Sequence, residues 1–303
     1  MADPLLDLRA PHAHHDLEAI VTADVTRALG EDMRGGDLTA SLIPSGAHGH
    51  ARVITRASGV MAGCEWFQRC FTELDPDCEI FWHVRDGDSV IADQQICEIK
   101  GNARALLSAE RSALNFLQTL SAVATKTRMF VDAIAGTKAK ILDTRKTLPG
   151  LRIASKFAVR MGGGHNHRIG LFDGILIKEN HIMAAGGIRP AMEAALKLVQ
   201  HSAPADTMIE IEVENMAQLK EALACGAKLI LLDNFTPAAM RKAVAFVAGR
   251  CELEASGGVN MKSVRTIAET GIDRISIGAL TKDIQALDLS MRFKINQDYK
   301  EKE

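Results

Sequence analysis

The 303-residue sequence has few aromatic side chains and almost no net charge. Phe, Trp and Tyr make up 4% of the residues, so the core must be built mainly from Ala, Leu, Ile, Val and Met. The 36 Lys and Arg residues nearly balance the 38 Asp and Glu residues, which leaves a formal charge of −2. Because polyanion-binding proteins need an excess of basic residues, this balance argues against nucleic acid as the main partner.

The sequence also lacks paired cysteines and long apolar runs. Its six cysteines form no C-x-x-C pair, which predicts buried thiols in a reducing compartment rather than a zinc site or a disulfide framework. No apolar run approaches the roughly 20 residues that cross a membrane. Residues 1–16 lack the basic and then apolar pattern of a secretion signal. We therefore expect a cytoplasmic protein without a membrane partner.

Residue patterns divide the chain into two domains and a tail. Residues 1–135 combine a β-rich segment at 49–100 with a long helical pattern at 103–135, and predict an α+β domain. Residues 136–290 alternate short apolar runs with helical patterns. Residues 291–303 are increasingly charged and predict a surface tail.

The second domain has the pattern of repeated β/α units. Helical patterns separate its apolar runs, and the last four runs recur about every 22 residues, a length that suits such units. A series of these units favours a β/α barrel, with an open doubly wound sheet as the alternative. The six runs are Ala139 to Leu142, Gly174 to Ile177, Met208 to Val213, Leu229 to Leu232, Glu252 to Ala255 and Arg274 to Ile277.

A local cluster of positive charge stands out in this neutral chain. Residues 141–181 contain many Lys, Arg and His residues and few acidic ones, which indicates a small bound anion rather than a polyanionic partner. The run Gly162-Gly163-Gly164 predicts backbone amides that approach an anion closely, although such a run also suits a simple helix exit.

Polar residues follow every predicted strand of the second domain. If the strands form a barrel, these residues converge on one mouth. In the third strand, alternation puts Glu210, Glu212 and Glu214 on one face, and at least one of them should pair with a cation. The residues at the other strand ends are Thr144, Arg145, Lys146, Lys178, Asn180, His181, Asp233, Asn234, Ser256, Gly257, Gly258, Gly278 and Ala279.

Several of these segments together resemble the signature of the quinolinate phosphoribosyltransferase family. They are Thr144 to Thr147, Pro149 to Arg152, Lys156, Gly162 to Gly164, His167-Arg168 and Lys178 to His181, and the resemblance extends from Gly36 to Thr281. It implies an α/β chain with an N-terminal α+β open-faced sandwich and a C-terminal, incomplete or irregular β/α barrel. The implied reaction joins quinolinate to phosphoribosyl pyrophosphate with loss of pyrophosphate and CO2.

The resemblance also implies a role for each matching residue. Quinolinate is a dianion, and bidentate arginine suits its planar carboxylates. The residues implied to bind it are Arg111, Thr144, Arg145, Lys146, His167, Arg168 and Lys178. The residues implied to bind the phosphoribosyl substrate are Lys146, Lys178, Glu212, Asp233, Ser256, Gly257, Gly258, Gly278 and Ala279. Lys146, Lys178, Glu212 and Asp233 are the expected catalytic residues, and Glu212 and Asp233 are expected to hold Mg²⁺, directly or indirectly.

The family also implies a homodimer or larger homo-oligomer in which Arg111 reaches the site of a neighbouring subunit. Three other functions stay open at this point. A related phosphoribosyltransferase without decarboxylation is the nearest. A zinc hydrolase using His165, His167 and His181 and a non-catalytic barrel that binds a phosphorylated metabolite are less favoured.

Overall fold

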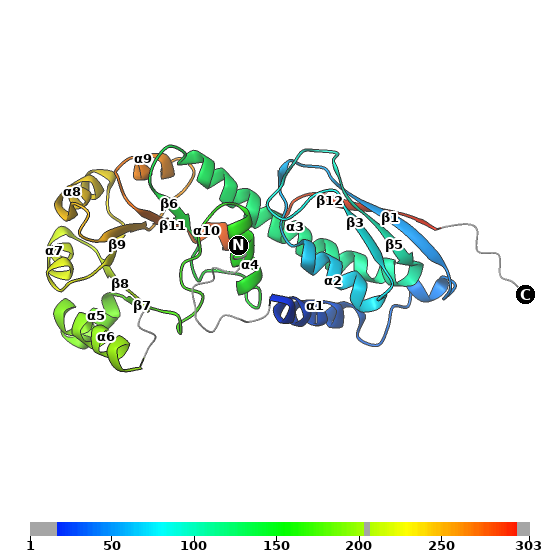
Figure 1. Cartoon of the computed structure of the whole chain (residues 1–303), viewed down its shortest axis with the longest axis horizontal. Helices are drawn as coiled ribbons and strands as arrows, with labels where there is room; N and C mark the ends of the chain where they lie inside the picture. Colours follow the sequence, from blue (N-terminus) through cyan, green and yellow to red (C-terminus); the bar gives the residue numbers. More distant parts are fainter. Residues whose placement is uncertain (1–16, 203–206, 296–303) are drawn as a thin grey trace, which may run out of the picture. The chain divides into compact units, whose positions relative to one another are not determined.

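The computed structural model describes residues 17–202 and 207–295 and contains two compact units (Figure 1). The barrel unit comprises described residues 127–147 and 164–282. The sandwich unit comprises described residues 17–126, 148–163 and 283–295. Each unit therefore collects segments that are far apart in the sequence.

The sandwich unit is built on an antiparallel sheet with the strand order β12-β1-β5-β3. In β1 buried and more exposed residues alternate, as expected for a sheet with one face on a core. A second small sheet pairs β2 with β4. The strands are β1 (His48–Thr55), β2 (Gly59–Val60), β3 (Glu79–Trp82), β4 (Ser89–Val90), β5 (Gln95–Asn102) and β12 (Leu289–Ile295).

Helices and a small aromatic cluster complete the sandwich unit. Trp66 and Phe67 on α2 are fully buried, and the Trp66 ring lies 5.3 Å from that of Phe157 on α4. The indole Nε1 of Trp66 donates to the buried carboxylate of Asp24, so its polar atom is satisfied. The helices are α1 (Leu17–Met33), η1 (Ala40–Leu42), α2 (Cys64–Leu74), α3 (Ala103–Ala133) and α4 (Arg152–Met161), and α3 continues into the barrel unit.

The barrel unit is a six-stranded parallel sheet with the order β6-β11-β10-β9-β8-β7. Its strands are short, and they are rich in apolar residues because helices cover one face of the sheet. Figure 1 shows the helices on the outer side of the curved sheet. The strands are β6 (Lys140–Leu142), β7 (Gly174–Ile177), β8 (Met208–Val213), β9 (Leu229–Asp233), β10 (Glu252–Ser256) and β11 (Arg274–Ser276).

Capping residues fix where the chain leaves two strands of the barrel unit. Asn215 accepts from the backbone N–H of Ala217 and Gln218 and so starts α7 directly after β8. Thr236 caps α8 in the same way after β9, and Pro237 follows it at the first helical position. The helices are α5 (Glu179–Ala185), α6 (Ile188–Ser202), α7 (Met216–Ala224), α8 (Pro237–Val247), α9 (Val264–Ala268) and α10 (Ala279–Lys282).

The sheet stays open between its first and second strands in the sequence. Strands β6 and β7 are the two edges, and no ladder joins them within the described residues. Next to β6, Leu142 forms a single parallel bridge with His165, whose backbone bonds to Ile141 O and Asp143 N. The predicted incomplete or irregular barrel is therefore confirmed, and the open sheet edge is occupied by residue 165.

The two units do not follow the predicted domain boundaries at residues 135 and 290. Residues 148–163 belong to the sandwich unit, and β12 pairs with β1 along Gly49–Thr55. Part of the predicted 291–303 tail is thus a sheet strand, because its backbone completes the edge beside β1; residues 296–303 lie outside the described residues. The six cysteines are free. Within the described ranges, no helix has the length and apolar character to span a membrane.

Candidate active site

Strand β8 carries the three glutamates that define the interior of the barrel unit. Glu210 is fully buried, Glu212 is partly exposed and Glu214, just past the strand, is exposed. Their exposure rises toward the carboxyl end of the strand, as expected for one face that runs from the barrel interior to its mouth. The Nζ of Lys178 lies 3.9 Å from Oε2 of Glu212, which confirms the predicted pairing of one glutamate with a cation.

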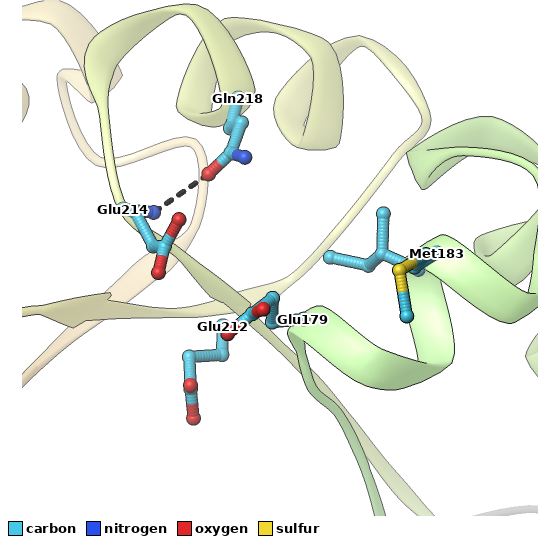
Figure 2. A pocket seen from close by; sticks show the side chains of 6 residues that line it. Glu179, Met183, Glu212, Glu214 and Gln218 are labelled. Carbon is cyan, nitrogen blue, oxygen red and sulfur yellow. Dashed lines mark hydrogen bonds between the residues drawn. The ribbon is translucent and has the colours of Figure 1, made fainter.

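A pocket of about 170 Å³ opens beside these glutamates. Figure 2 shows Glu212 and Glu214 coming from the end of β8, Met183 from α5 and Gln218 from α7. Gln218 Oε1 accepts from the backbone N–H of Glu214 and fixes the chain at that point. The lining residues are Glu179, Ile182, Met183, Glu212, Glu214 and Gln218. The pocket is therefore acidic and lies at the carboxyl ends of β7 and β8.

Electrostatic effects on Glu212 show which charges gather at this mouth. Burial raises the pKa of the Glu212 carboxyl, and the positive charge of Lys178 opposes that effect. The negative charge of Asp233, at the end of β9, raises the same pKa. Glu212 and Asp233 are thus close enough to repel each other, an arrangement that favours a bound cation.

Below this mouth, a buried network connects three strands. The imidazole Nε2 of His167 lies 2.8 Å from Glu210 Oε2 and 3.6 Å from Glu254 Oε1 on β10. The guanidinium Nε of Arg274, on β11, lies 3.5 Å from Glu254 Oε2. Burial raises the pKa of Glu210 and that of Glu254 to about 7, and the charge of Glu210 adds to the effect on Glu254. These two carboxyls therefore hold a proton far more readily than exposed ones.

His167, Glu210 and Glu254 are also close enough together to hold a metal ion. The hydrogen bonds of His167 instead indicate that a proton, and not a metal ion, lies between its ring and Glu210. His167 Nδ1 accepts from the backbone N–H of Arg168 at 2.7 Å, so the ring proton is on Nε2 and points at Glu210. Arg274 already supplies positive charge there. This network suits positioning rather than metal binding, which the carboxylates at the mouth suit better.

The loop from β6 to β7 presents the cations of the site. Asp143 is fully buried and accepts from the backbone N–H of His167 at 2.9 Å and from Asn166 Nδ2 at 2.5 Å. Burial lowers the pKa of Arg168, and the positive charge of Arg145 lowers it further. The positive charges of Arg145 and Arg168 therefore act on each other. Arg145 lies just after β6, and Arg168 lies shortly before β7.

Glycines at the ends of β10 and β11 make close contacts with residues of neighbouring strand ends. Gly257 has φ = +94°, and a Cβ there would lie 2.1 Å from Oδ1 of Asn234. A Cβ on Gly278 would lie 2.8 Å from Cδ of Lys146 and 3.4 Å from Oγ1 of Thr144. Both positions therefore favour glycine, because a side chain there would collide with Asn234 or with Lys146.

The barrel unit brings together most of the predicted site residues. Lys178, Glu212 and Asp233 meet at one mouth, Arg145 approaches Arg168, and Lys146 lies beside Gly278. Ser256 is at the end of β10 and accepts a backbone bond from Asn234, Gly258 follows with φ = +60°, and Ala279 begins α10. Arg111 lies on α3 in the sandwich unit, where its side chain is exposed.

One prediction about the cationic stretch needs correction. The amides of Gly162 and Gly163 donate to Ala158 O and Arg160 O, so they end α4 rather than approach an anion. Arg152, Lys156 and Arg160 lie on α4, which belongs to the sandwich unit.

Asp143, Glu254 and Arg274 contribute to the site and were not predicted to do so. A signal for Glu254 was available, because it precedes Ser256 by two residues and so shares its inward face. The burial of Asp143 depends on the loop that folds back onto β6, and no residue pattern predicts that fold.

The comparisons with known proteins agree on one family. The chain matches the family models described as quinolinate phosphoribosyl transferase, N-terminal domain, over residues 37–121, and C-terminal domain, over residues 123–292. It is 40% identical over 268 residues to a probable nicotinate-nucleotide pyrophosphorylase (carboxylating) of Bacillus subtilis, covering 88% of this chain and 91% of the relative. A quinolinate phosphoribosyltransferase (decarboxylating) of Nicotiana tabacum is 36% identical over 305 residues, covering 95% and 85%. The solved nicotinate-nucleotide pyrophosphorylase of Francisella tularensis is 44% identical, with a TM-score of 0.87 and coverage of 91% and 97%.

Proposed function

The chain belongs to the quinolinate phosphoribosyltransferase family, and on this premise we propose its reaction and the roles of its residues. It transfers the phosphoribosyl group of phosphoribosyl pyrophosphate to quinolinate and releases pyrophosphate and CO₂. The product is nicotinate mononucleotide, which serves NAD biosynthesis. The chain is thus a pentosyltransferase.

The positions of Arg145 and Arg168 carry the substrate assignment, because Asp143, two residues before Arg145, accepts from the backbone N–H of His167, the residue before Arg168. Two guanidinium groups that repel each other in the free protein gain most from a ligand that brings two negative charges. Quinolinate has two neighbouring carboxylates and fits this demand, whereas nicotinate has one. Lys178 stands at the same mouth, and Thr144 and Lys146 follow the same strand as Arg145.

The carboxyl ends of β10 and β11 suit the phosphoribosyl substrate. Ser256, Gly257 and Gly258 lie at the end of β10, and Gly278 and Ala279 lie at the end of β11, where β/α barrels bind a phosphate. Lys146 and Lys178 suit the pyrophosphate as compact positive charges. Glu212 and Asp233 suit the ribose hydroxyls.

The same two carboxylates fit Mg²⁺, whose preferred ligands are oxygens, alone or through water. The observation behind this fit is that Glu212 and Asp233 repel each other while Lys178 is 3.9 Å from Glu212. When bound, Mg²⁺ would supply positive charge to the leaving pyrophosphate.

Positioning and electrostatics are sufficient for the chemistry, without a protein nucleophile. As the bond from the anomeric carbon to pyrophosphate breaks, Lys146 and Lys178 stabilise the leaving oxygens, and Glu212 and Asp233 favour the positive charge that develops on the ribose. The ring nitrogen of quinolinate, held by Arg145 and Arg168, then bonds to that carbon. Its positive charge accepts the electron pair of the breaking carbon–carboxylate bond, CO₂ leaves, and the ring carbon takes a proton.

The family resemblance further supports a homodimer or larger homo-oligomer in which Arg111 of a neighbouring subunit binds quinolinate. A cytoplasmic location, and the lack of nucleic-acid and membrane partners, stay predictions from the sequence.

The test is to measure CO₂ and pyrophosphate release with quinolinate and, separately, with nicotinate, each with phosphoribosyl pyrophosphate. Release of both products from quinolinate, with little turnover of nicotinate, supports the proposal. Faster pyrophosphate release with nicotinate would instead favour the alternative, a related transferase without decarboxylation.

A further inference from the structure

The imidazole of His167 uses both of its nitrogens inside the barrel unit. Nδ1 accepts from the backbone N–H of Arg168 at 2.7 Å, and Nε2 lies 2.8 Å from Oε2 of Glu210. Because a nitrogen that accepts carries no proton, the neutral ring is protonated at Nε2 and donates to Glu210. The resemblance implied that His167 binds substrate, but neither nitrogen is free to do so in this arrangement.

Burial makes the hydrogen bond between His167 and Glu210 costly to break. The side chains of His167 and Glu210 are 6% and 0% exposed. Oε1 of Glu210 has no hydrogen-bond partner among the described residues, so the bond from His167 is important to this carboxyl group. Turning the ring toward a ligand would leave a buried carboxyl group without that donor, which is unfavourable.

A second carboxylate holds the same segment from the other side. Asp143, directly after β6, accepts from the backbone N–H of His167 and from the side chain of Asn166. Residues 166–168 are thus fastened both to the end of β6 and to the middle of β8, which are far apart in the order of the sheet. The loop has little freedom at this point.

The residue fixed by these bonds is Arg168. Its backbone N–H bonds to His167, and its Nη1 donates to Gly174 O at 3.0 Å. The backbone and the guanidinium group of Arg168 are therefore both held, and the positive charge of Arg145 acts on this guanidinium. A charged group held in this way loses little freedom when it binds an anion.

We propose that Glu210 and His167 are positioning residues that fix the Arg168 guanidinium for quinolinate, and that His167 acts through Arg168 rather than on the substrate. The inference rests on the proposed function, because that function places quinolinate at Arg168. It assigns Glu210, which lies two residues before Glu212 on the same face of β8, a role different from that of Glu212.

The first test reads the histidine ring directly. In wild-type protein with ¹⁵N-labelled histidine, nitrogen NMR should show His167 as the neutral Nε2–H tautomer, with the His167→Gln variant identifying its signals. Quinolinate at a concentration that saturates turnover should leave this tautomer unchanged. An Nδ1–H or doubly protonated ring, in the free protein or with quinolinate, would overturn the proposal.

The second test compares two variants of Glu210. Glu210→Gln keeps an oxygen that accepts from Nε2–H, whereas Glu210→Leu has a similar size and no acceptor. We expect Glu210→Leu to raise the KM for quinolinate by about tenfold or more, and Glu210→Gln by no more than about threefold. The KM for phosphoribosyl pyrophosphate should change by less than about twofold in both.

Equal effects of the two variants, or equal changes in both KM values, would contradict positioning through His167. If Glu210→Leu does not fold, the His167 tautomer measured by NMR in the wild type still tests the proposal. Failure of the proposed function would look different: the wild type would release no CO₂ from quinolinate, whatever the tautomer of His167.

Discussion

Lys146 occupies the space that a side chain at Gly278 would fill, since a Cβ on Gly278 would lie 2.8 Å from Lys146 Cδ. This contact joins the end of β11 to the end of β6, the two strands that pair at that edge of the sheet. We expect Gly278→Ala to displace Lys146 and to lower kcat/KM by roughly tenfold to 100-fold, because a shift of about 1 Å at a catalytic group has effects of this size.

The melting temperature should change little in this variant, because Lys146 is a flexible, exposed side chain that can move away. Gly30→Ala is a suitable control, since a Cβ at that position meets nothing within 4 Å. Unchanged kinetics of Gly278→Ala would show that the position of Lys146 is not important for turnover.

Arg145→Ala and Lys178→Ala should each reduce kcat/KM strongly without unfolding the protein. Each removes an exposed cation from the mouth, and losing a charge-assisted hydrogen bond to substrate costs about 1.5–3 kcal/mol, or roughly tenfold to 100-fold. Steady-state kinetics and thermal melting measure the two effects. Lys242→Ala, on the exposed side of α8, is the matched control. If both variants turn over quinolinate like the wild type, the residue assignments are wrong.

The stability of the protein should fall as the pH rises toward neutrality, because of Glu254. Burial and the charge of Glu210 raise the pKa of Glu254 from 4.5 to about 7 in the folded protein. The folded state therefore keeps a proton that the unfolded chain has released. The stabilising contribution is complete below about pH 4.5 and is lost as the pH rises through about 7.

Urea unfolding at about pH 5 and at about pH 8 measures this effect. One unit of pKa shift corresponds to about 1.4 kcal/mol, so the wild type should lose on the order of a few kcal/mol between the two pH values. Glu254→Gln cannot titrate at this position and should lose less, whereas Glu193→Gln, an exposed glutamate on α6, should behave like the wild type. The same pH dependence in all three proteins would contradict the origin assigned to it.

Mg²⁺ removal should abolish turnover, and two acidic residues at the mouth should differ in how strongly turnover by their variants depends on Mg²⁺. After treatment with a chelator, added Mg²⁺ should restore activity. Glu212→Gln should require about tenfold or more Mg²⁺ for half-maximal activity, because partners of a metal site commonly contribute this much. Glu214 lines the same pocket, so Glu214→Gln is the control and should need less additional Mg²⁺ than Glu212→Gln. If Glu214→Gln instead raised the Mg²⁺ requirement more than Glu212→Gln, Glu214 rather than Glu212 would be the metal-binding residue.

Two inactive variants should restore activity together if Arg111 acts on a neighbouring subunit. In a mixture of Arg111→Ala and Lys178→Ala subunits, some pairs contain one site with both residues intact. Mixing after reversible dissociation should therefore recover part of the wild-type activity, up to about a quarter if subunits pair at random. A mixture as inactive as its components would contradict action in trans.

Strand positions in the barrel unit could be predicted closely from the sequence. The predicted strands at Met208 to Val213 and Gly174 to Ile177 coincide with β8 and β7. In β7 the apolar residues are continuous, and in β8 they alternate with glutamates, and both patterns are typical of strands. The helix α5 (Glu179–Ala185) was not predicted, since it is short and has no buried residue to give it an apolar period.

Side-chain roles were harder to predict than strand positions. The residues at strand ends were identified because a barrel makes such ends converge. In contrast, the buried network of His167, Glu210 and Glu254 depends on contacts between strands that are distant in the sequence. Periodicity shows which face a residue occupies, but it does not show which partner a buried carboxylate will have.

The open edge of the sheet has a consequence for how the barrel unit moves. Between β6 and β7 the described residues form no ladder, and β6 is flanked there by residue 165 and the bonds from Asp143 to residues 166 and 167. The side chains that hold the loop thus also protect the amides along this edge. Amide hydrogen exchange at Asp143 and His165 should therefore slow when quinolinate binds. Binding of the ligand and protection of the open sheet edge would then be coupled.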